Sequence, residues 1–328
     1  MTRQPSHAPR HFKAIIIGAG PSGIGVAVAL SNQGVFPVAI IEREATVGGI
    51  PALYKGIKGG IKTFIRWSKG GIPIHGDRYA EWLEKKLSGT RTIVFLQSHV
   101  LETNTINKEV TLVNAIEGKV TLTAGAIILA CGAREKSMTE KGWITGTRAE
   151  NLYYGRQIVE LESMHQLPPL KKPVILGSDV LAYAIAAKLT KAGARRIVIL
   201  DETQKPKCTL LERLYFRRWT HPDFLSVRGS NIEVTGDNGA SGIMAGDREV
   251  STDAIILGGD LVPNSELAIA GGLEVALPER IPVVSKGFIL SQPGWFAAGN
   301  ILGGSRGAEW CYHNGLKTGK KVAVLLSS

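Results

Sequence analysis

Short apolar runs and amphipathic stretches follow one another along the chain in the order strand, helix, strand. Residues 14–17 are all apolar and predict a buried strand, and the glycine-rich residues 18–23 then turn the chain into a helix. A second apolar run, residues 38–41, predicts the next strand. Between residues 77 and 87 the apolar positions recur on one side of a helix. This order is typical of an α/β fold with a parallel sheet.

The turn after the first strand has the chemistry of a dinucleotide site. Gly18 permits the tight turn, Gly20 leaves room for a pyrophosphate, and Gly23 lets the helix pack closely on the strand. The helix N-terminus presents N–H groups and a positive dipole end to the phosphates. Glu42 follows Gly23 by 19 residues, where a carboxylate accepts hydrogen bonds from an adenosine ribose. The alternative is an ordinary strand–turn–helix without a ligand.

Beyond residue 91 the pattern changes to short strands. The runs 92–96, 110–113 and 119–123 predict a β-meander, because turn residues separate apolar and β-branched segments. The meander leads into residues 126–129, a buried strand that ends in small residues and can lie flat against a cofactor.

The second half of the chain repeats this plan. The apolar run 173–176 enters a helix through Gly177, and the strand that follows ends in Asp201. Gly177 precedes Asp201 by 24 positions, and Gly18 precedes Glu42 by 24 as well. Such self-similarity at a fixed spacing indicates two dinucleotide-binding units in tandem.

A linker at Pro168-Pro169 comes before the second unit, and another strand-rich segment, residues 225–250, ends in the buried run 254–257. A last strand near residue 296 and a helix over 308–326 return to the first domain. We therefore expect two Rossmann-like domains, each with a parallel sheet and a β-meander, the second inserted in the first. The expected boundaries are a flexible tail over 1–12, a first dinucleotide-binding domain over 13–134 and 263–328, and a second domain over 135–262.

Composition narrows the class of protein. The 328 residues are 44% hydrophobic and 20% charged, which is ordinary for a globular protein. No apolar run reaches the ~18 residues of a membrane span, and the polar first dozen residues lack the apolar centre of a signal peptide. The scattered Cys131, Cys208 and Cys311 argue against a disulfide framework, a redox-active pair or a metal site. We expect a cytoplasmic protein.

The net charge of +11 calls for an anionic ligand or partner. No nucleic-acid motif is present, so we expect no nucleic-acid partner. Between residues 51 and 78 the chain is rich in glycine and cations, and it is either a solvated basic face or a positive funnel for an anionic substrate or another protein chain. The cations are Lys55, Lys58, Lys62, Arg66 and Lys69.

These residues together resemble the two-dinucleotide-binding-domain flavoproteins, the pyridine-nucleotide disulfide oxidoreductase superfamily. The resemblance covers residues 11–326. Ala130-Cys131-Gly132 is similar to the family's Ala-Thr-Gly motif, and Ala298-Gly299-Asn300 is similar to its Ala-Gly-Asp motif, whose acid holds the ribityl chain of FAD. Asn300 keeps a hydrogen-bonding group but lacks the charge.

Within the superfamily the chain resembles the flavin subunits of multi-subunit dehydrogenases in Gly132-Ala133-Arg134-Glu135, in Gly146-Thr147-Arg148-Ala149 and in residues 297–302. That group includes opine dehydrogenases, hydrogen cyanide synthase and dye-linked proline dehydrogenases. The resemblance implies that FAD binds the first site, in residues of the glycine turn and of the strand ends near it. They are Gly18, Gly20, Pro21, Ser22, Gly23, Glu42, Arg43, Gly49, Val100, Ala130, Cys131, Gly132, Gly299, Asn300 and Ala308.

The second site, made of Gly177, Asp179 and Asp201, departs from the pattern. Asp179 stands where the motif needs its middle glycine, so a side chain and a like charge meet the pyrophosphate. Asp201 suits NAD better than NADP, because its charge opposes a 2′-phosphate. We expect weak NAD(H) binding or none. The alternative is a different turn in which Asp179 points away and caps the helix.

The resulting hypothesis is an FAD-dependent dehydrogenase or electron-relay subunit of a complex with other dehydrogenase subunits. Its substrate would be an amino or imino acid, an opine or a similar small anionic molecule. A disulfide reductase is not expected, because a cysteine pair is missing. His75, Glu309 and His313 are the candidates for an acid or base. The rivals are an NADH-dependent flavin reductase or oxidase and a non-catalytic scaffold subunit that is either FAD-bound or degenerate.

Overall fold

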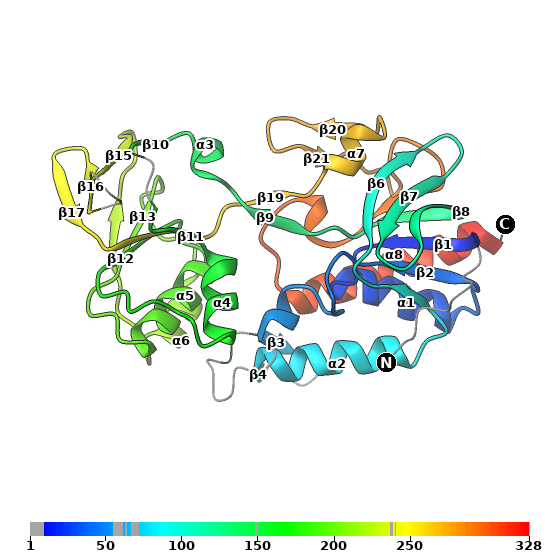
Figure 1. Ribbon diagram of the computed structural model, residues 1–328, viewed down its shortest axis with the longest axis horizontal. Coiled ribbons are helices and arrows are strands. Elements are labelled where there is room, and N and C mark those ends of the chain that lie inside the picture. The colour runs from blue at the N-terminus through cyan, green and yellow to red at the C-terminus, as the bar shows by residue number, and fades with distance from the viewer. Residues whose placement is uncertain are drawn as a thin grey trace. The chain divides into compact units, whose positions relative to one another are not determined.

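The chain folds into two compact units (Figure 1). The structure is a computed structural model, and it describes residues 10–54, 62, 64–66, 72–147, 150–236, 239 and 241–327. The first unit comprises Met1–Lys55, Phe64–Arg134 and Val262–Ser328, and the second comprises Gly56–Thr63 and Glu135–Leu261. The chain passes between them as β9 (Ala133–Glu135) and β19 (Leu261–Pro263), which pair with each other. The main part of the second unit is therefore an insertion in the first.

A parallel sheet in the order β5–β2–β1–β8 forms the centre of the first unit, and β22 pairs in parallel with β8. The first part of β8 instead pairs antiparallel with β7, which pairs with β6. The strands are β1 His11–Ile17, β2 Val38–Ile41, β5 Ile93–Phe95, β6 His99–Asn104, β7 Glu109–Asn114, β8 Gly118–Leu129 and β22 Trp295–Ala297.

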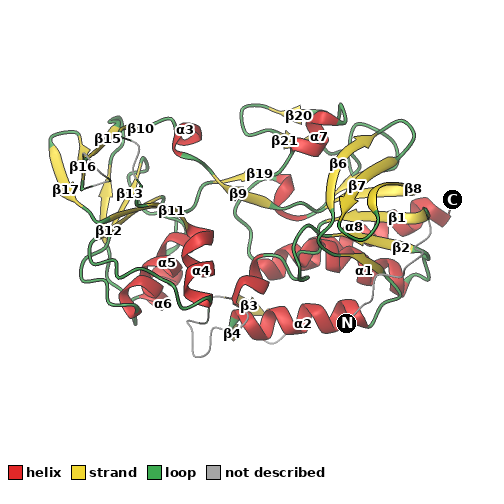
Figure 2. Ribbon diagram, viewed as in Figure 1, coloured by secondary structure: helices red, strands yellow, loops and turns green. Residues whose placement is uncertain are grey.

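Three helices cover one face of this sheet, and the meander covers the other (Figure 2). They are α1 (Pro21–Asn32), α2 (Gly76–Ser88) and α8 (Ala308–Ser327). The alternation of β1 explains both layers, because Ala14 and Ile16 pack toward the helices while Ile15 and Ile17 pack on the meander side. The smaller elements are η1 Ile50–Tyr54, β3 Phe64–Arg66, β4 Ile72–Ile74, α7 Glu266–Ala270, β20 Val275–Ala276, β21 Ile281–Pro282 and η3 Gly299–Leu302.

Helices α1 and α8 lie side by side, and glycines set their close approach (Figure 1). A Cβ at Gly25 would lie 2.3 Å from the carbonyl oxygen of Tyr312, and one at Gly315 would lie 2.0 Å from that of Ser22. Both are far inside the contact distance of real Cβ atoms. Only glycine allows this crossing, which holds the start of α8 beside the turn after β1.

The second unit has the same strand order. Its parallel sheet runs β14–β13–β12–β18–β11, and a second sheet runs β10–β15–β16–β17. Helices α4 (Gly155–Ser163), α5 (Val180–Lys191) and α6 (Leu210–Phe216) pack on one face of the parallel sheet, and a short α3 (Met138–Lys141) precedes β10. The strands are β10 Ile144–Gly146, β11 Leu152–Tyr154, β12 Pro173–Leu176, β13 Val198–Asp201, β14 Asp223–Ser226, β15 Ile232–Thr235, β16 Gly242–Ala245, β17 Arg248–Ser251 and β18 Ala254–Leu257.

The predicted α/β class with two Rossmann-like units is confirmed, but several element assignments change. The run 92–96 is not part of the meander: β5 pairs in parallel with β2, and in the second unit β14 likewise pairs with β13. The runs 119–123 and 126–129 are one strand, β8, and β6 was not predicted. The tail also ends earlier than expected, because Phe12 lies in β1 and is fully buried.

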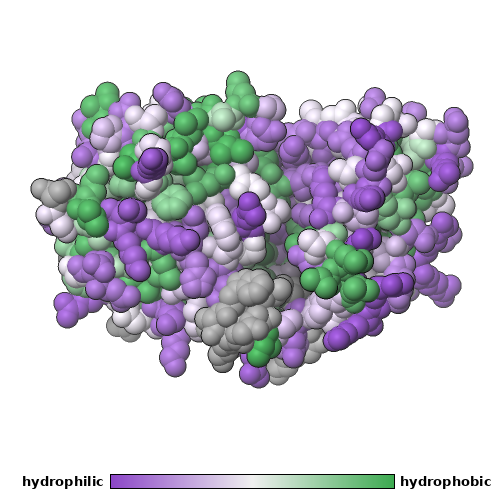
Figure 3. Space-filling model, turned by 180° about the vertical axis from the view of Figure 1, so that it is seen from behind, coloured by the Kyte–Doolittle hydropathy of each residue, from purple (hydrophilic) through white to green (hydrophobic). Residues whose placement is uncertain are grey.

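Apolar and polar residues share the surface, as one face of the molecule shows (Figure 3). Of the predicted basic segment, Lys55, Lys58 and Lys69 lie outside the described residues. Lys62 is exposed, and the backbone of Arg66 belongs to β3. A positive funnel therefore stays a prediction.

Candidate dinucleotide sites

In the turn between β1 and α1, two of the three glycines leave no room for a Cβ because other backbone atoms lie too close. Gly18 has a φ of 107°, and a Cβ there would lie 2.5 Å from the carbonyl oxygen of Ala130, the residue after β8. A Cβ at Gly23 would lie 1.9 Å from the carbonyl oxygen of Gly18. At Gly20 the nearest atom to such a Cβ is the Cα of Gly49, 4.0 Å away. No contact with the described part of the chain requires Gly20, so its missing side chain leaves space for a ligand.

The N-terminus of α1 is open to a ligand. Gly20 is the N-cap, with φ −74° and ψ −177°, and no described side chain caps the helix there. Ser22 and Gly23 follow it at the second and third positions of α1, where backbone N–H groups have no partner within a helix. Such N–H groups and the helix dipole bind a phosphate.

Glu42 follows β2 directly, next to this turn, and is buried. Its Oε2 accepts a hydrogen bond from the Ala19 N–H at 2.7 Å, and its Oε1 accepts one from the Glu44 N–H at 2.9 Å. Both partners are backbone groups, and each carboxylate oxygen has a further lone pair. The carboxylate is therefore held in place and can still accept hydrogen bonds from hydroxyl groups.

The loop after β22 meets the same turn. A Cβ at Gly299 would lie 1.9 Å from the Oγ of Ser22, so the two residues are in direct contact. The Gly299 N–H donates to the Oδ1 of Asn314 on α8 at 2.7 Å. Asn314 is a buried residue that fixes this loop, and it was not predicted from the sequence.

Asn300 differs from the expectation for a cofactor ligand. Its Nδ2 donates to the carbonyl oxygen of Arg306 at 3.0 Å, and its Oδ1 accepts from the Arg306 N–H at 3.1 Å. The same Oδ1 also accepts from the Cys311 thiol at 3.4 Å, so the side chain closes its own loop with contacts inside the protein.

The other candidate residues surround this turn in different ways. Gly49 packs on Gly20, and Ala308 is the first residue of α8. Arg43 is exposed and pairs with Glu44 at 3.5 Å. Val100 lies in β6, two residues beyond Ser98, whose N–H donates to the carbonyl oxygen of Glu42. The remaining candidates are Pro21, which begins α1, and Cys131 and Gly132, which follow β8.

Glu309 and His313 form a pair on the first turns of α8. Glu309 is buried, and its Oε2 accepts a hydrogen bond from the hydroxyl of Tyr79 at 2.9 Å. Its Oε1 lies 3.5 Å from the Nε2 of the half-exposed His313. His75 is the N-cap residue of α2, and its side chain does not cap that helix. Two of the three candidates for an acid or base are therefore neighbours.

In the second unit, the equivalent helix N-terminus carries its own carboxylate. Asp179 is the N-cap of α5, with φ −80° and ψ −175°. Its Oδ1 accepts hydrogen bonds from the N–H groups of Leu181 at 3.0 Å and Ala182 at 3.2 Å. These are the positions of Ser22 and Gly23 in α1. The alternative prediction that Asp179 caps the helix is confirmed, and the backbone angles of Asp179 match those of Gly20.

Lys207 lies beside the second acid, Asp201. Its Oδ2 accepts from the hydroxyl of Ser178 at 2.6 Å and lies 3.4 Å from the Nζ of Lys207. Asp260 binds both Lys207 and the buried Lys141, whose Nζ lies 3.0 Å away. Unlike Glu42, Asp201 is therefore paired with a side-chain cation.

The ion pairs of this cluster shift the pKa values of Asp260 and Lys207. Burial alone would raise the pKa of Asp260, but Lys141 and Lys207 outweigh it and lower that pKa. Burial alone would lower the pKa of Lys207, but its bonds to Asp260 and Asp201 outweigh it and raise that pKa. Both groups are charged at neutral pH.

The pKa values of the three cysteine thiols are also shifted, in this case by burial. Burial, the main cause, raises the pKa of Cys131 and of Cys208 to about 12 and that of Cys311 to about 11. Because the thiolate is the reactive form, none of them is a nucleophile near neutral pH. Among the described residues, no group of three His, Cys, Asp or Glu side chains could hold a metal ion. No described helix is long and apolar enough to span a membrane.

Two units of the same plan, one inserted in the other, define the two-domain dinucleotide oxidoreductases. The chain belongs to the pyridine nucleotide-disulphide oxidoreductase family, whose profile matches residues 12–318. This is a family of flavoproteins that use FAD, and some relatives also interact with NAD(P).

A subunit of opine oxidase from Rhizobium meliloti is 24% identical over 91% of this chain, which spans 60% of that protein's length. Thioredoxin reductase of T. acidophilum has the same fold, with a TM-score of 0.75, 17% identity and coverage of 98% of this chain and all of that one. L-proline dehydrogenase of P. horikoshii has a TM-score of 0.65 and 21% identity, with coverage of 94% of this chain and 54% of that one.

Proposed function

We propose that this chain is an FAD-dependent oxidoreductase that binds FAD in the first unit and binds NAD(H) weakly or not at all in the second. The observation that carries the proposal is the difference between two equivalent helix N-termini. α1 begins at Gly20 without a side-chain cap, whereas the carboxylate of Asp179 takes the two corresponding N–H groups of α5. A pyrophosphate would meet open donors in one unit and a carboxylate in the other.

The residues of the first unit divide the binding of FAD among them. The N–H groups of α1 would hold the pyrophosphate, and Glu42 would hold the adenosine ribose. The N-terminus of α8 adds a positive dipole end, and Asn314 keeps Gly299 against Ser22. FAD supplies the redox chemistry when bound. Within the chain, the buried Glu309 and the half-exposed His313 provide sites that can hold a proton.

We propose a substrate of the amino acid, imino acid or opine class, oxidised in a complex with other subunits. The names of two relatives, a proline dehydrogenase and an opine oxidase, support this class. The net charge of +11 supports an anionic substrate or partner. Disulfide reduction is disfavoured despite the fold of thioredoxin reductase, because the three cysteines are scattered and their thiols have raised pKa values.

A reciprocal pair of variants tests the proposal. Gly20→Asp gives α1 the cap that α5 has, and we expect it to lose FAD, measured by flavin absorbance after reconstitution of the full chain. Asp179→Gly is the matched control, and it should keep a full complement of FAD. An equal flavin content in both variants would contradict the assignment of the site. A wild-type chain that takes up no flavin would favour the scaffold alternative, and rapid bleaching by stoichiometric NADH would favour the flavin reductase.

A further inference from the structure

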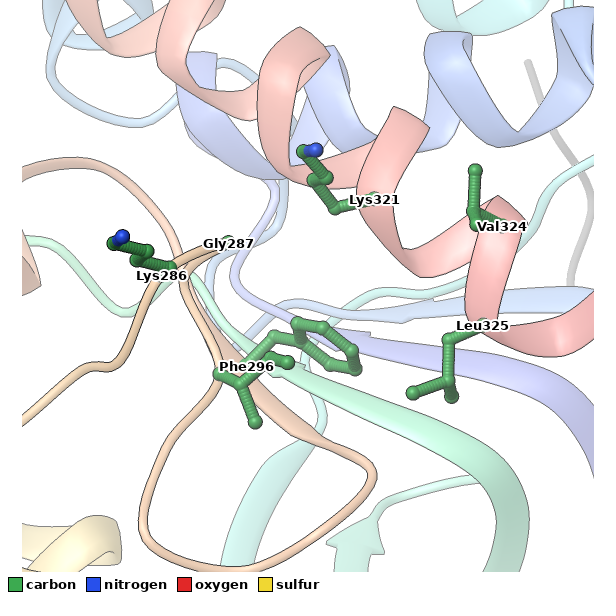
Figure 4. A pocket seen from close by; sticks show the side chains of 7 residues that line it. Lys286, Gly287, Phe296, Lys321, Val324 and Leu325 are labelled. Atoms are coloured by element: carbon green, nitrogen blue, oxygen red, sulfur yellow. The ribbon is translucent and has the colours of Figure 1, made fainter.

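A groove lies on the first unit at the C-terminal half of α8. It is a cavity of about 330 Å³ between α8 and the segment around Gly287, with the ring of Phe296 beneath it (Figure 4). Its apolar walls are Ile289, Phe296, Val324 and Leu325, and the lysines at its rim are Lys286 and Lys321.

The apolar part of the groove is open to water. Phe296 is 1% exposed and fixed in the core, but Val324 is 70% exposed and Leu325 is 39% exposed. Single exposed apolar residues are common on proteins. Two of them beside a cavity with an aromatic floor form a surface that can bury a further apolar side chain.

Positive charge surrounds this apolar surface. No carboxylate of the described residues pairs with Lys286 or Lys321. Lys317 is one helical turn before Lys321 on α8 and is also exposed, so the cationic stripe continues beyond the cavity. A complementary ligand therefore carries negative charge, has one apolar group and is longer than the cavity.

The groove is separate from the candidate FAD site within the first unit. α8 has 20 residues and is about 30 Å long, with its start beside Gly299 and its last turns at the groove. A ligand in the groove would leave the N-terminus of α1 uncovered.

We propose that this groove docks a segment of a partner protein in which an apolar side chain is flanked by carboxylates. The apolar side chain enters between Phe296 and Val324, and the carboxylates pair with Lys286 and Lys321. A small amphiphile would fill the cavity but leave Lys317 unused, so the length of the stripe favours a peptide.

The test selects ligands without assuming a sequence. A displayed library of random short peptides is selected on the immobilised full chain and counter-selected on the variant Lys286→Glu/Lys321→Glu. We expect enrichment of peptides that carry a large apolar residue between Asp or Glu residues. The best peptide is then synthesised, and its affinity is measured by fluorescence anisotropy.

We expect the charge variant and Val324→Ser/Leu325→Ser each to weaken this peptide about tenfold. The control Lys205→Glu/Arg228→Glu changes the net charge equally on exposed residues of the second unit, and it should stay within about twofold. High salt should weaken binding to the wild type. Flavin content and circular dichroism verify each fold, and Lys321→Gln and Val324→Thr are milder replacements for a variant that unfolds.

Two kinds of result would overturn the proposal. In one, no acidic, apolar peptide is enriched, or the selected peptide binds the charge variant as well as the wild type. In the other, octanoate or phosphatidylglycerol vesicles bind the groove with the same dependence on the variants while peptides do not, which would assign it to an amphiphile or a lipid surface. Flavin content is unaffected in either case, so the proposed function is tested separately.

Discussion

At the scale of the residue, Gly20 and Asp179 occupy the same position in two copies of one turn. Their backbone angles differ by only a few degrees, yet one helix begins with open N–H groups and the other with a built-in anion. An N-cap carboxylate competes for the same donors that a pyrophosphate would use. One carboxyl group therefore separates a site that can accept a dinucleotide from one that already holds its own anion.

Asp179→Gly should raise the affinity for NADH by about tenfold, because it frees the donors of α5 and removes the like charge. Glycine is itself a good N-cap, so unfolding free energy should fall by only about 0.3 kcal/mol. Asp179→Ala is the control: it loses about 1 kcal/mol and keeps a Cβ in the way of the ligand. Calorimetric titration and thermal unfolding measure both effects. An unchanged NADH affinity in the glycine variant would mean that Asp179 is not the barrier.

At the scale of the element, the crossing of α1 and α8 determines the shape of the candidate FAD site. Gly315→Ala would place a methyl group 2.0 Å from the Ser22 carbonyl oxygen and force the helices apart. Overpacking outweighs the gain in helix propensity, so we expect a net loss of about 1–2 kcal/mol in unfolding free energy. FAD affinity should fall too, since Ser22 belongs to the turn.

Gly89→Ala is the matched control for this crossing. Its Cβ would lie 3.6 Å from the nearest neighbouring atom, the carbonyl oxygen of Lys86, which is an ordinary contact. Denaturant unfolding and flavin titration of both variants compare the two positions. Equal stability and equal FAD affinity in the two variants would show that α1 and α8 can separate without cost.

The ion cluster of Asp260 joins three parts of the second unit: α3, the loop after β13 and the residue before β19. Asp260→Asn leaves the buried Lys141 without its partner and should cost about 2 kcal/mol at neutral pH. Asparagine tolerates the positive φ of 49° at this position, so the backbone should be kept.

The pH dependence of this cost follows from the two shifted pKa values. The lowered pKa of Asp260 gives stability above the usual value of 3.8, which is lost as pH falls through the folded-state pKa. The raised pKa of Lys207 gives stability below the usual 10.5, which is lost as pH rises through its folded-state pKa. The difference between wild type and Asp260→Asn should therefore shrink below about pH 4 and above about pH 11.

Denaturant unfolding across this pH range measures the difference, with Asp223→Asn as control. Asp223 pairs with Arg196 on the surface, where both side chains are more than 60% exposed, so its loss should cost less than about 0.5 kcal/mol. A difference for Asp260→Asn that persists unchanged into acid would contradict the role of the ion pairs.

At the scale of the whole molecule, the sequence predicts what local patterns determine. The apolar strands, the glycine turns and the repeat at equal spacing are contiguous features, and the structure has both units where the repeat indicates them. The runs 119–123 and 126–129 were predicted as separate strands but form one, β8, and the Gly125 between them has the Lys13 carbonyl oxygen 3.0 Å from its Cβ position. β6 was missed because its alternation is weak and mostly exposed.

The parts of the sites that the sequence does not reveal depend on pairs of distant residues. Asn314 accepts a hydrogen bond from the N–H of Gly299, 15 positions before it, and Lys141 pairs with Asp260, 119 positions after it. No local pattern marks such pairs. The comparison of two similar motifs in the sequence identifies Asp179 as the residue that differs. Its hydrogen bonds to the N–H groups of α5 are seen only in the structure.

The insertion of one unit in the other also sets an order for synthesis. Apart from Gly56–Thr63, the second unit is a continuous stretch that is complete once Leu261 has been made, whereas the first unit lacks β22 and α8 until the last part of the chain emerges. Domains fold as units during translation. On a ribosome the second unit can therefore fold while β1, β2 and α1 still wait for their final strand and helix. During that interval the apolar face of α1 that α8 will cover stays exposed to water.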